Sequence, residues 1–215
     1  MNSIDRTDRS TSGISTRRAL VKGATWAVPV LATAVAAPAV AASPVTCPSI
    51  DAPDQWTLSQ NEYAVTGQTS IGPATVQGST RDVITVQTEN NTANNSGLDA
   101  EVRWTTQLDV VAGTTYTFDF FARGTYGSNN PAVSQASYST LSVDGMTQAT
   151  YTTRSEVYPG TQIPMDGSWA EQSISYTATA TGTVPLEFLF VMPSREGTET
   201  SQDDHYYELP RITCS

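Results

Sequence analysis

Apolar and polar residues alternate along most of the chain after residue 50, in short runs rich in Thr, Val, Tyr and Phe that are separated by Gly, Pro, Asn and Asp. Successive side chains of a β-strand point to opposite faces, so this period of two predicts strands that bury one face. The clearest run is 115–123. Its even positions, which we expect in the core, are Tyr116, Phe118, Phe120 and Ala122, and its odd positions are Thr117, Asp119, Phe121 and Arg123.

Similar runs predict strands elsewhere in the chain. Their apolar positions are Val102, Trp104 and Leu108, then Ile174, Tyr176 and Ala178, and then Val184, Leu186, Phe188 and Phe190. Additional strands are expected at 82–88, 138–143, 147–154 and 205–213. No stretch of this region has the period of an amphipathic helix. The pattern therefore predicts an all-β fold, an antiparallel β-sandwich in which two packed sheets form a single domain.

The N-terminal region has the pattern of an export signal. The segment Thr16-Arg17-Arg18-Ala19-Leu20-Val21-Lys22 precedes an Ala- and Val-rich stretch that ends in Ala39-Val40-Ala41-Ala42. Adjacent arginines, a modest apolar region and small residues two apart resemble a twin-arginine (Tat) signal peptide, with Leu20 and Val21 in place of the usual Phe and Leu. The resemblance implies that a bacterium exports the folded protein and removes residues 1–42 as a signal peptide, with cleavage after Ala41 or Ala42. The domain then occupies residues 43–215.

A permanent membrane span is the alternative to a cleaved signal peptide. The apolar stretch contains Thr25, Pro29, Thr33 and Pro38 and has no run of Leu or Ile. A membrane-spanning helix needs about 20 predominantly apolar residues. We therefore expect no stable membrane span after processing, and a protein that works outside the cytoplasm, secreted or associated with the cell surface.

Removal of the leader makes the chain more acidic. The whole sequence has a formal net charge of −10. After residue 42 it keeps 6 arginines and no lysine against 19 carboxylates, which gives −13. A charge of this sign repels phosphate backbones and anionic membrane surfaces, so nucleic acid is not an expected partner.

Cys47 and Cys214 lie at the two extremes of the region that remains after processing. In an oxidising compartment such a pair is expected to form a disulfide. Lipid modification of Cys47 is the rival interpretation. The preceding Pro44-Val45-Thr46 lacks the small residue that this processing requires, so the sequence favours the disulfide.

The order of motifs after the leader resembles that of the galactose-binding-like jelly rolls of the carbohydrate-binding-module type. The matching segments are Trp56-Thr57-Leu58, the strand at 113–123, Gly167-Ser168-Trp169 followed by 173–178, the Gly-x-Val-x-Leu-x-Phe strand at 182–188, and the closing strand at 205–212. This resemblance implies a jelly-roll sandwich that binds carbohydrate. In this family an aspartate of the closing strand usually helps to hold a structural calcium ion, and here Glu208 departs from that pattern and occupies about that place, so calcium is the one cofactor that the resemblance suggests.

Aromatic residues on polar strand faces are the first candidates for a ligand site, because an aromatic ring offers an apolar surface to a sugar ring. Trp104 shares its face with Val102 and Leu108 and is expected in the core. The residues we single out for ligand binding are the aromatic Phe121, Tyr126 and Tyr138 and the hydrogen-bond donors Arg103, Arg123 and Arg154. Tyr126 and Tyr158 are exposed candidates on the long loops 124–137 and 155–168, and a third long loop spans 193–204. For each candidate, ordinary strand-to-strand packing is the alternative.

A catalytic role is not favoured by the residue inventory. His205 is the single histidine, and no Gly-x-Ser-x-Gly motif is present. A β-sandwich glycoside hydrolase is the enzymatic alternative, since it needs only two opposed carboxylates. The sequence thus leaves two functions open. One is an exported domain that binds carbohydrate or another component of the cell envelope, and the other is a surface domain that is structural or contacts another surface protein without recognising a sugar.

Overall fold

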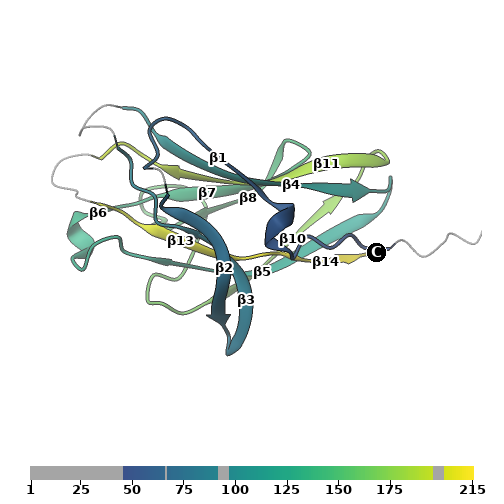
Figure 1. The fold of residues 1–215 in the computed structure, drawn as a ribbon, viewed down its shortest axis with the longest axis horizontal. Coiled ribbons are helices and arrows are strands. Elements are labelled where there is room, and N and C mark those ends of the chain that lie inside the picture. The colour runs from purple at the N-terminus through teal and green to yellow at the C-terminus, as the bar shows by residue number, and fades with distance from the viewer. Residues whose placement is uncertain (1–45, 66, 92–96, 196–200) are drawn as a thin grey trace, which may run out of the picture. The chain divides into compact units, whose positions relative to one another are not determined.

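A computed structural model describes residues 46–65, 67–91, 97–195 and 201–215. Two six-stranded sheets pack face to face (Figure 1). Sheet I contains, in spatial order, β1 (Thr57–Gln60), β4 (Ala100–Val110), β11 (Gly182–Met192), β7 (Tyr138–Val143), β8 (Met146–Thr152) and β9 (Thr161–Gln162). Sheet II contains β10 (Ala170–Thr177), β5 (Thr115–Thr125), β13 (Asp204–Glu208), β3 (Ser79–Val86) and β2 (Thr69–Val76), with β14 (Arg211–Cys214) also paired with β5. The expected antiparallel β-sandwich is confirmed.

Short elements complete the described part of the chain. The strands β6 (Ser134–Gln135) and β12 (Ser201–Gln202) form a small parallel pair. Two 3-10 helices, η1 (Pro53–Gln55) and η2 (Pro131–Val133), are the helical segments of the described residues. β8 and β9 also run parallel, while the long strands of both sheets pair antiparallel.

The core lies between the sheets and is rich in aromatic rings. The expected inward positions of β5, Tyr116, Phe118, Phe120 and Ala122, are fully buried. From sheet I, Phe188 meets Phe120 edge to face with ring centroids 5.5 Å apart. Such pairs are worth about 0.5–1.5 kcal/mol beyond the area that they bury. The alternation seen in the sequence therefore sets which face of each strand is available to a ligand.

The closing segment differs from the single strand expected at 205–213. It forms β13 and β14, which are separated at Leu209-Pro210 and both pair with β5. Tyr207 lies opposite Ala122, and Arg211 lies opposite Asp119. One extra residue on the closing segment is a β-bulge. Pro210 explains the interruption, because proline has no N–H to donate to a sheet.

The disulfide between Cys47 and Cys214 is present, with Cα atoms 5.7 Å apart. It joins residues 167 positions apart in the sequence. In the chain-entropy model a loop of this length stabilises the folded state by about 5 kcal/mol, as an upper figure. The expected signal peptide, with Arg17 and Arg18, lies outside the described residues. Among the residues that the structure does describe, no helix has the length and apolar character needed to cross a membrane.

Candidate ligand-binding groove

A groove of about 870 Å³ opens on the outer face of sheet I, near the ends of β7 and β8. Its volume lies in the range of small-molecule sites, about 300–1,000 Å³. Segments that precede β4 and follow β8 and β11 border it. The lining residues are Gly97, Asp99, Gln135, Tyr138, Thr140, Thr150, Val157, Tyr158, Pro159, Gly160, Pro193 and Ser194. The groove thus combines two tyrosine rings with carboxylate, amide and hydroxyl groups.

Tyr138 and Tyr158 form the aromatic part of the groove. Their ring centroids are 5.0 Å apart and the ring planes are inclined by 44°. Tyr138 stands on the outer face of β7 because Leu141 and Val143 point into the core. Both tyrosines are half-buried. Tyr138 was predicted as a ligand platform from its phase, and the structure places it in the groove.

A tight turn after β8 brings Tyr158 to this place. The backbone N–H groups of Val157 and Tyr158 both donate to the carbonyl oxygen of Arg154, each at 3.1 Å. The chain then passes so close to β8 that a Cβ on Gly160 would lie 2.7 Å from the carbonyl oxygen of Thr150. Gly160 also has φ +145°, a backbone conformation that residues with a side chain rarely adopt. Glycine is therefore required where the loop returns to the sheet.

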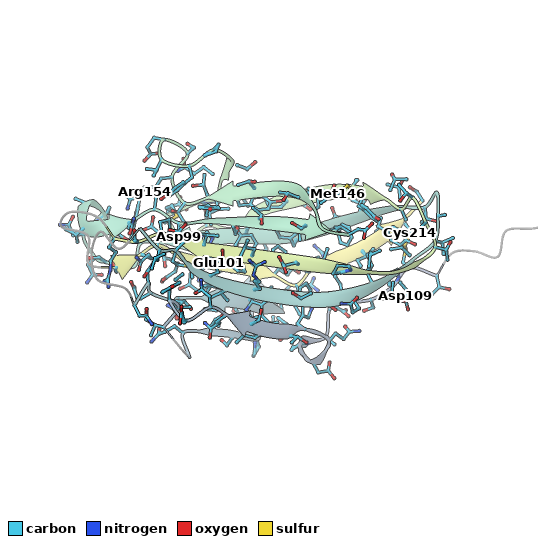
Figure 2. All side chains as sticks on the ribbon, turned by 90° about the horizontal axis from the view of Figure 1, so that it is seen from above. Asp99, Glu101, Asp109, Met146, Arg154 and Cys214 are labelled. Carbon is cyan, nitrogen blue, oxygen red and sulfur yellow. A yellow bond between two sulfur atoms is a disulfide. The ribbon has the colours of Figure 1, made fainter. Side chains whose placement is uncertain are left out.

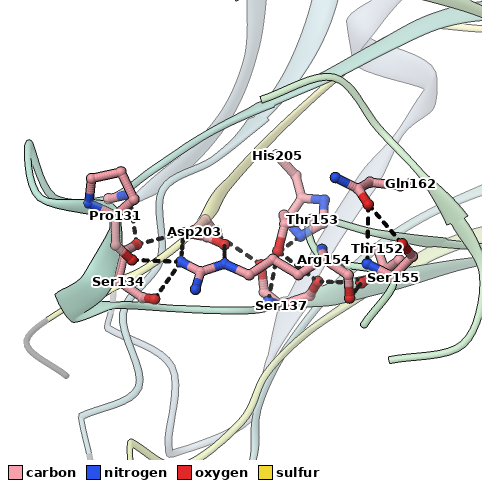
Figure 3. Close-up of polar contacts among 11 residues, drawn as sticks. Pro131, Ser134, Ser137, Thr152, Thr153, Arg154, Ser155, Gln162, Asp203 and His205 are labelled. Atoms are coloured by element: carbon pink, nitrogen blue, oxygen red, sulfur yellow. Dashed lines mark hydrogen bonds and ion pairs between the residues drawn. The ribbon is translucent and has the colours of Figure 1, made fainter. Parts of the chain in front are cut away.

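The side chain of Arg154 ties the start of the same loop to the segments that contain Ser134 and Asp203 (Figure 3). Its Nε lies 3.2 Å from Oδ2 of Asp203, a carboxylate with no exposed side-chain surface. Its Nη2 donates to the carbonyl oxygens of Pro131, at 2.9 Å, and of Ser134. Ser134 donates its hydroxyl to Asp203 as well. Arg154 was predicted to donate hydrogen bonds to a ligand; its Nε and Nη2 are engaged within the protein, where they hold the groove wall.

A carboxylate lies on the polar side of the groove. Asp99 lines the groove just before β4, at the same end of the domain as Arg154 (Figure 2), and Glu101 follows two residues later on β4. Burial raises the pKa of the Tyr138 phenol, and the negative charges of Asp99 and Glu101 raise this pKa further. Arg103, another predicted ligand donor, lies on this face but forms ion pairs with Glu101 at 2.7 Å and with Glu187 at 3.0 Å. The groove therefore presents acceptors rather than a free positive charge.

A serine and a histidine lie beneath this end of the sheet. The Oγ of Ser137 and Nε2 of His205 are 2.8 Å apart, which is the spacing of a nucleophile and its base. Both side chains have no exposed surface. Burial lowers the pKa of His205 to about 3. This neutral, enclosed pair belongs to the hydrogen-bonded core, together with Tyr207, and does not reach the groove.

Two of the predicted ligand residues lie on the opposite side of the domain. Phe121 and Arg123 occupy the outer face of β5 in sheet II, whereas Tyr138 belongs to sheet I. The structure therefore separates Phe121 from Tyr138 and gives them no common groove.

Tyr126 is 37 % exposed and lies against the guanidinium of Arg154, whose carbon is 5.3 Å from the ring centroid. It borders a second hollow of about 620 Å³ with residues 162–166.

Glu208, the residue suggested for calcium, has surroundings that do not fit such an ion. Its carboxylate lies 3.5 Å from Nε of Arg81 and 3.8 Å from Nε of Arg211. Its other oxygen accepts the backbone N–H of Phe121 at 3.2 Å. Calcium needs six to eight oxygen ligands, and two guanidinium groups repel a cation. No group of three or more metal-binding side chains occurs in the described ranges.

Several groove residues were not singled out from the sequence. Thr140 and Thr150 face the groove from β7 and β8, and the alternation that placed Tyr138 outside the core also places Thr140 there. Asp99, Gln135 and Ser194 carry no local signal of binding, because only the fold brings their segments together.

Comparisons with known proteins give similarities of fold at low sequence identity. No protein-family model matches the chain, and a search of curated proteins finds no match. One similar structure is TmCBM61 in complex with beta-1,4-galactotriose, with 11 % identity, a TM-score of 0.43, and coverage of 77 % of this chain and 92 % of that one. A second is a putative sugar binding protein from Bacteroides thetaiotaomicron, with 12 % identity, a TM-score of 0.37, and coverage of 80 % and 92 %.

A third similar structure is the enzymatically active domain of tailspike protein 4 of bacteriophage CBA120. It has 14 % identity and a TM-score of 0.40, and the match covers 77 % of this chain but 20 % of that one. Similarity at these levels decides neither ligand nor activity.

Proposed function

We propose that this protein is an exported, non-catalytic domain that binds a neutral carbohydrate in the groove on sheet I. The observation that carries the proposal is the pair formed by Tyr138 and Tyr158, which borders a groove that also contains hydroxyl, amide and carboxylate groups. A pyranose ring has an apolar face and a rim of hydroxyls. Aromatic rings match the face, and a few well-placed polar groups match the rim.

The charges at the groove favour a neutral ligand over an acidic one. Asp99, which lines the groove, can accept hydrogen bonds from sugar hydroxyls, and the negative charges of Asp99 and Glu101 near Tyr138 repel a ligand carboxylate or sulfate. Arg103 does not offset this repulsion for a ligand, because Glu101 and Glu187 already engage it. The sequence resemblance to carbohydrate-binding modules predicts the same general ligand class.

The positions of the carboxylates and the burial of the serine and histidine pair support binding without hydrolysis. Glycosidases place two carboxyl groups on opposite sides of the scissile bond. Asp99 is the one carboxylate among the described residues that line the groove, and Glu101, which follows it on β4, is held by Arg103. The Ser137 and His205 pair is enclosed. Export is supported by the disulfide, since such bonds persist mainly in oxidising compartments.

Calorimetric titration with neutral oligosaccharides tests the proposal, with galactan, xylan, mannan and glucan fragments as probes. We expect one of them to bind the purified protein, and Tyr158→Ala to weaken binding about 30-fold, as the loss of about 2 kcal/mol at an aromatic contact. Met146→Ala is the matched control, because this side chain is 52 % exposed at the far end of the same sheet. Equal binding by the wild type and by Tyr158→Ala, or binding of none of the probes, contradicts the proposal.

A further inference from the structure

Arg123 differs from the other arginines of the described residues. Four of them, Arg81, Arg103, Arg154 and Arg211, form ion pairs. Arg195 donates to the carbonyl oxygen of Asn90. Within the described ranges, the guanidinium of Arg123 has neither an ion pair nor a hydrogen bond, and its Nε is buried without a partner. In the part of the chain that the structure describes, the positive charge of Arg123 thus has no ion-paired counter-charge.

Two aromatic rings hold this guanidinium in place. Its carbon lies 4.3 Å from the ring centroid of Tyr206 and 4.9 Å from that of Trp169. Tyr206 is the direct β13 partner of Arg123, and Trp169 immediately precedes β10, whose Ala170 pairs with Ala122. The three side chains therefore form a row across the outer face of sheet II, which we call the Arg123 row. Cation–π contacts of this kind contribute without neutralising the charge.

The acidic groups around the Arg123 row leave its charge available. Asp204 already accepts hydrogen bonds from Thr125 at 3.1 Å and from Gln87 at 3.3 Å. Glu208 is engaged by two arginines and by the N–H of Phe121. Glu171, opposite Phe121, is exposed to solvent. Asp166 accepts from the N–H and hydroxyl of Ser168.

We propose that the Arg123 row is a second binding site, specific for the carboxylate of an acidic sugar. A guanidinium offers paired N–H donors in a plane, which matches the two oxygens of a carboxylate. The rings hold the side chain in advance, so little conformational entropy is lost on binding. Arg123 is half-buried, which lowers the screening of its charge while leaving it accessible.

Phe121 makes this a site for a sugar acid rather than for a small anion. It lies two residues from Arg123 on the same face of β5, a separation of about 7 Å along a strand. Its ring is half-buried and has a position suited to contact one face of a pyranose whose carboxylate meets Arg123. The site shares no residue with the groove on sheet I, so the proposal does not depend on the function proposed for that groove.

Calorimetric titration with oligogalacturonate, and with its methyl ester as the neutral counterpart, tests the site. We expect the acid to bind at the Arg123 row with a stoichiometry of one, and the ester to show no binding that depends on Arg123. Arg123→Gln is expected to weaken binding of the acid at least about tenfold, as the loss of a charge-assisted pair. Arg103→Gln is the matched control, because this outer-face arginine is already ion-paired and is expected to leave binding unchanged. A sulfated galactan that binds better than oligogalacturonate contradicts the assignment to a carboxylate.

A measurement on the wild-type protein covers the case in which Arg123→Gln does not fold. The Arg123 Nε–H signal in a 15N NMR spectrum is expected to shift when oligogalacturonate is added and to stay unchanged with the ester. An unchanged signal at a concentration where calorimetry detects binding places the acid elsewhere and overturns the proposal. Tyr158→Ala separates the two sites, since it is expected to retain oligogalacturonate binding while losing binding of the neutral sugar.

Discussion

The outer faces of the two sheets each carry an arginine on a long strand, but the charge of this arginine is neutralised on one face and remains on the other. On sheet I, Arg103 lies between Glu101 and Glu187 and its charge is neutralised. On sheet II, Arg123 lies between Trp169 and Tyr206 and its charge remains. Both arginines occupy outward positions of long central strands. The neighbouring side chains, rather than the arginine itself, therefore determine what each face can bind.

The two faces also differ in how they are supported. The groove depends on a loop that Arg154 fixes to the buried Asp203, whereas the Arg123 row is built on paired strands. A loop-built site is sensitive to the loss of one anchor. A strand-built site changes only when the residues of the row themselves change.

Removal of the loop anchor is expected to have the largest effect. Arg154→Ala leaves the buried carboxylate of Asp203 without its ion pair, which typically lowers the free energy of unfolding by about 3–5 kcal/mol. We expect this loss in urea denaturation, together with loss of neutral-sugar binding and retention of oligogalacturonate binding. Arg103→Ala is the control, since its exposed pairs are worth only about 0–1 kcal/mol. Equal destabilisation by the two substitutions would show that Arg154 is not a special anchor.

The pH dependence of the free energy of unfolding tests whether His205, which is buried beneath the groove, is neutral in the folded protein. The pKa of His205 is lowered to about 3 in the folded state, from an ordinary value of 6.5, so the unfolded chain binds the extra proton between these values. The free energy of unfolding should therefore fall as the pH is lowered from about 6.5 towards 3, by up to about 1.4 kcal/mol per pH unit.

His205→Gln is expected to remove this part of the slope in urea denaturation at several pH values. Burial raises the pKa of Glu89 and Asp204, so these two carboxyl groups act in the opposite direction and stabilise as the pH falls. Their contribution is present in both proteins and cancels in the difference. Identical slopes for wild type and variant would be inconsistent with a buried neutral histidine.

The contrast between the two faces can be reversed by removing the partners of Arg103. In the double variant Glu101→Gln and Glu187→Gln, Arg103 keeps its place on β4 but loses both counter-charges. We expect oligogalacturonate to acquire a second, weaker site, so that the calorimetric stoichiometry rises from one towards two. Glu171→Gln, an exposed acid of sheet II, is the control and should leave the stoichiometry at one. An unchanged stoichiometry in the double variant means that charge alone does not distinguish the faces.

Chelation is expected to have the smallest effect. Because Arg81 and Arg211 surround Glu208, addition of EDTA should leave the thermal midpoint unchanged. Differential scanning calorimetry with and without added calcium checks this. A midpoint that rises with calcium and falls with EDTA would mean that an ion is held by other residues.

The alternation of residues predicts the sandwich and which strand positions face outward. It predicts the buried Phe118 and Phe120, and it places Phe121 and Tyr138 outside the core. A period of two says which side of its own sheet a residue takes, but it does not say to which sheet the strand belongs. For this reason the sequence grouped Phe121 with Tyr138, although they lie on opposite sheets.

The role of Arg154 could not be predicted for a related reason. Its partners Pro131, Ser134 and Asp203 lie 20 to 49 residues away along the chain and meet it only through the strand order. Tyr158 carries no periodic signal because a loop turn places it, so the sequence offered it only as an exposed loop candidate and did not place it beside Tyr138. Residues whose positions follow from local pattern were thus predicted, and those whose positions follow from topology were not.

The bond between Cys47 and Cys214 orients the domain with respect to anything attached ahead of it. Cys214 lies at one end of the sandwich, and Asp99 and Arg154 lie at the other (Figure 2). A bead, a dye or a solid support coupled just before Cys47 would therefore sit remote from the groove and leave its mouth facing the solution. The cross-link keeps this geometry because it ties the residue beside the attachment point to the last strand by a covalent bond.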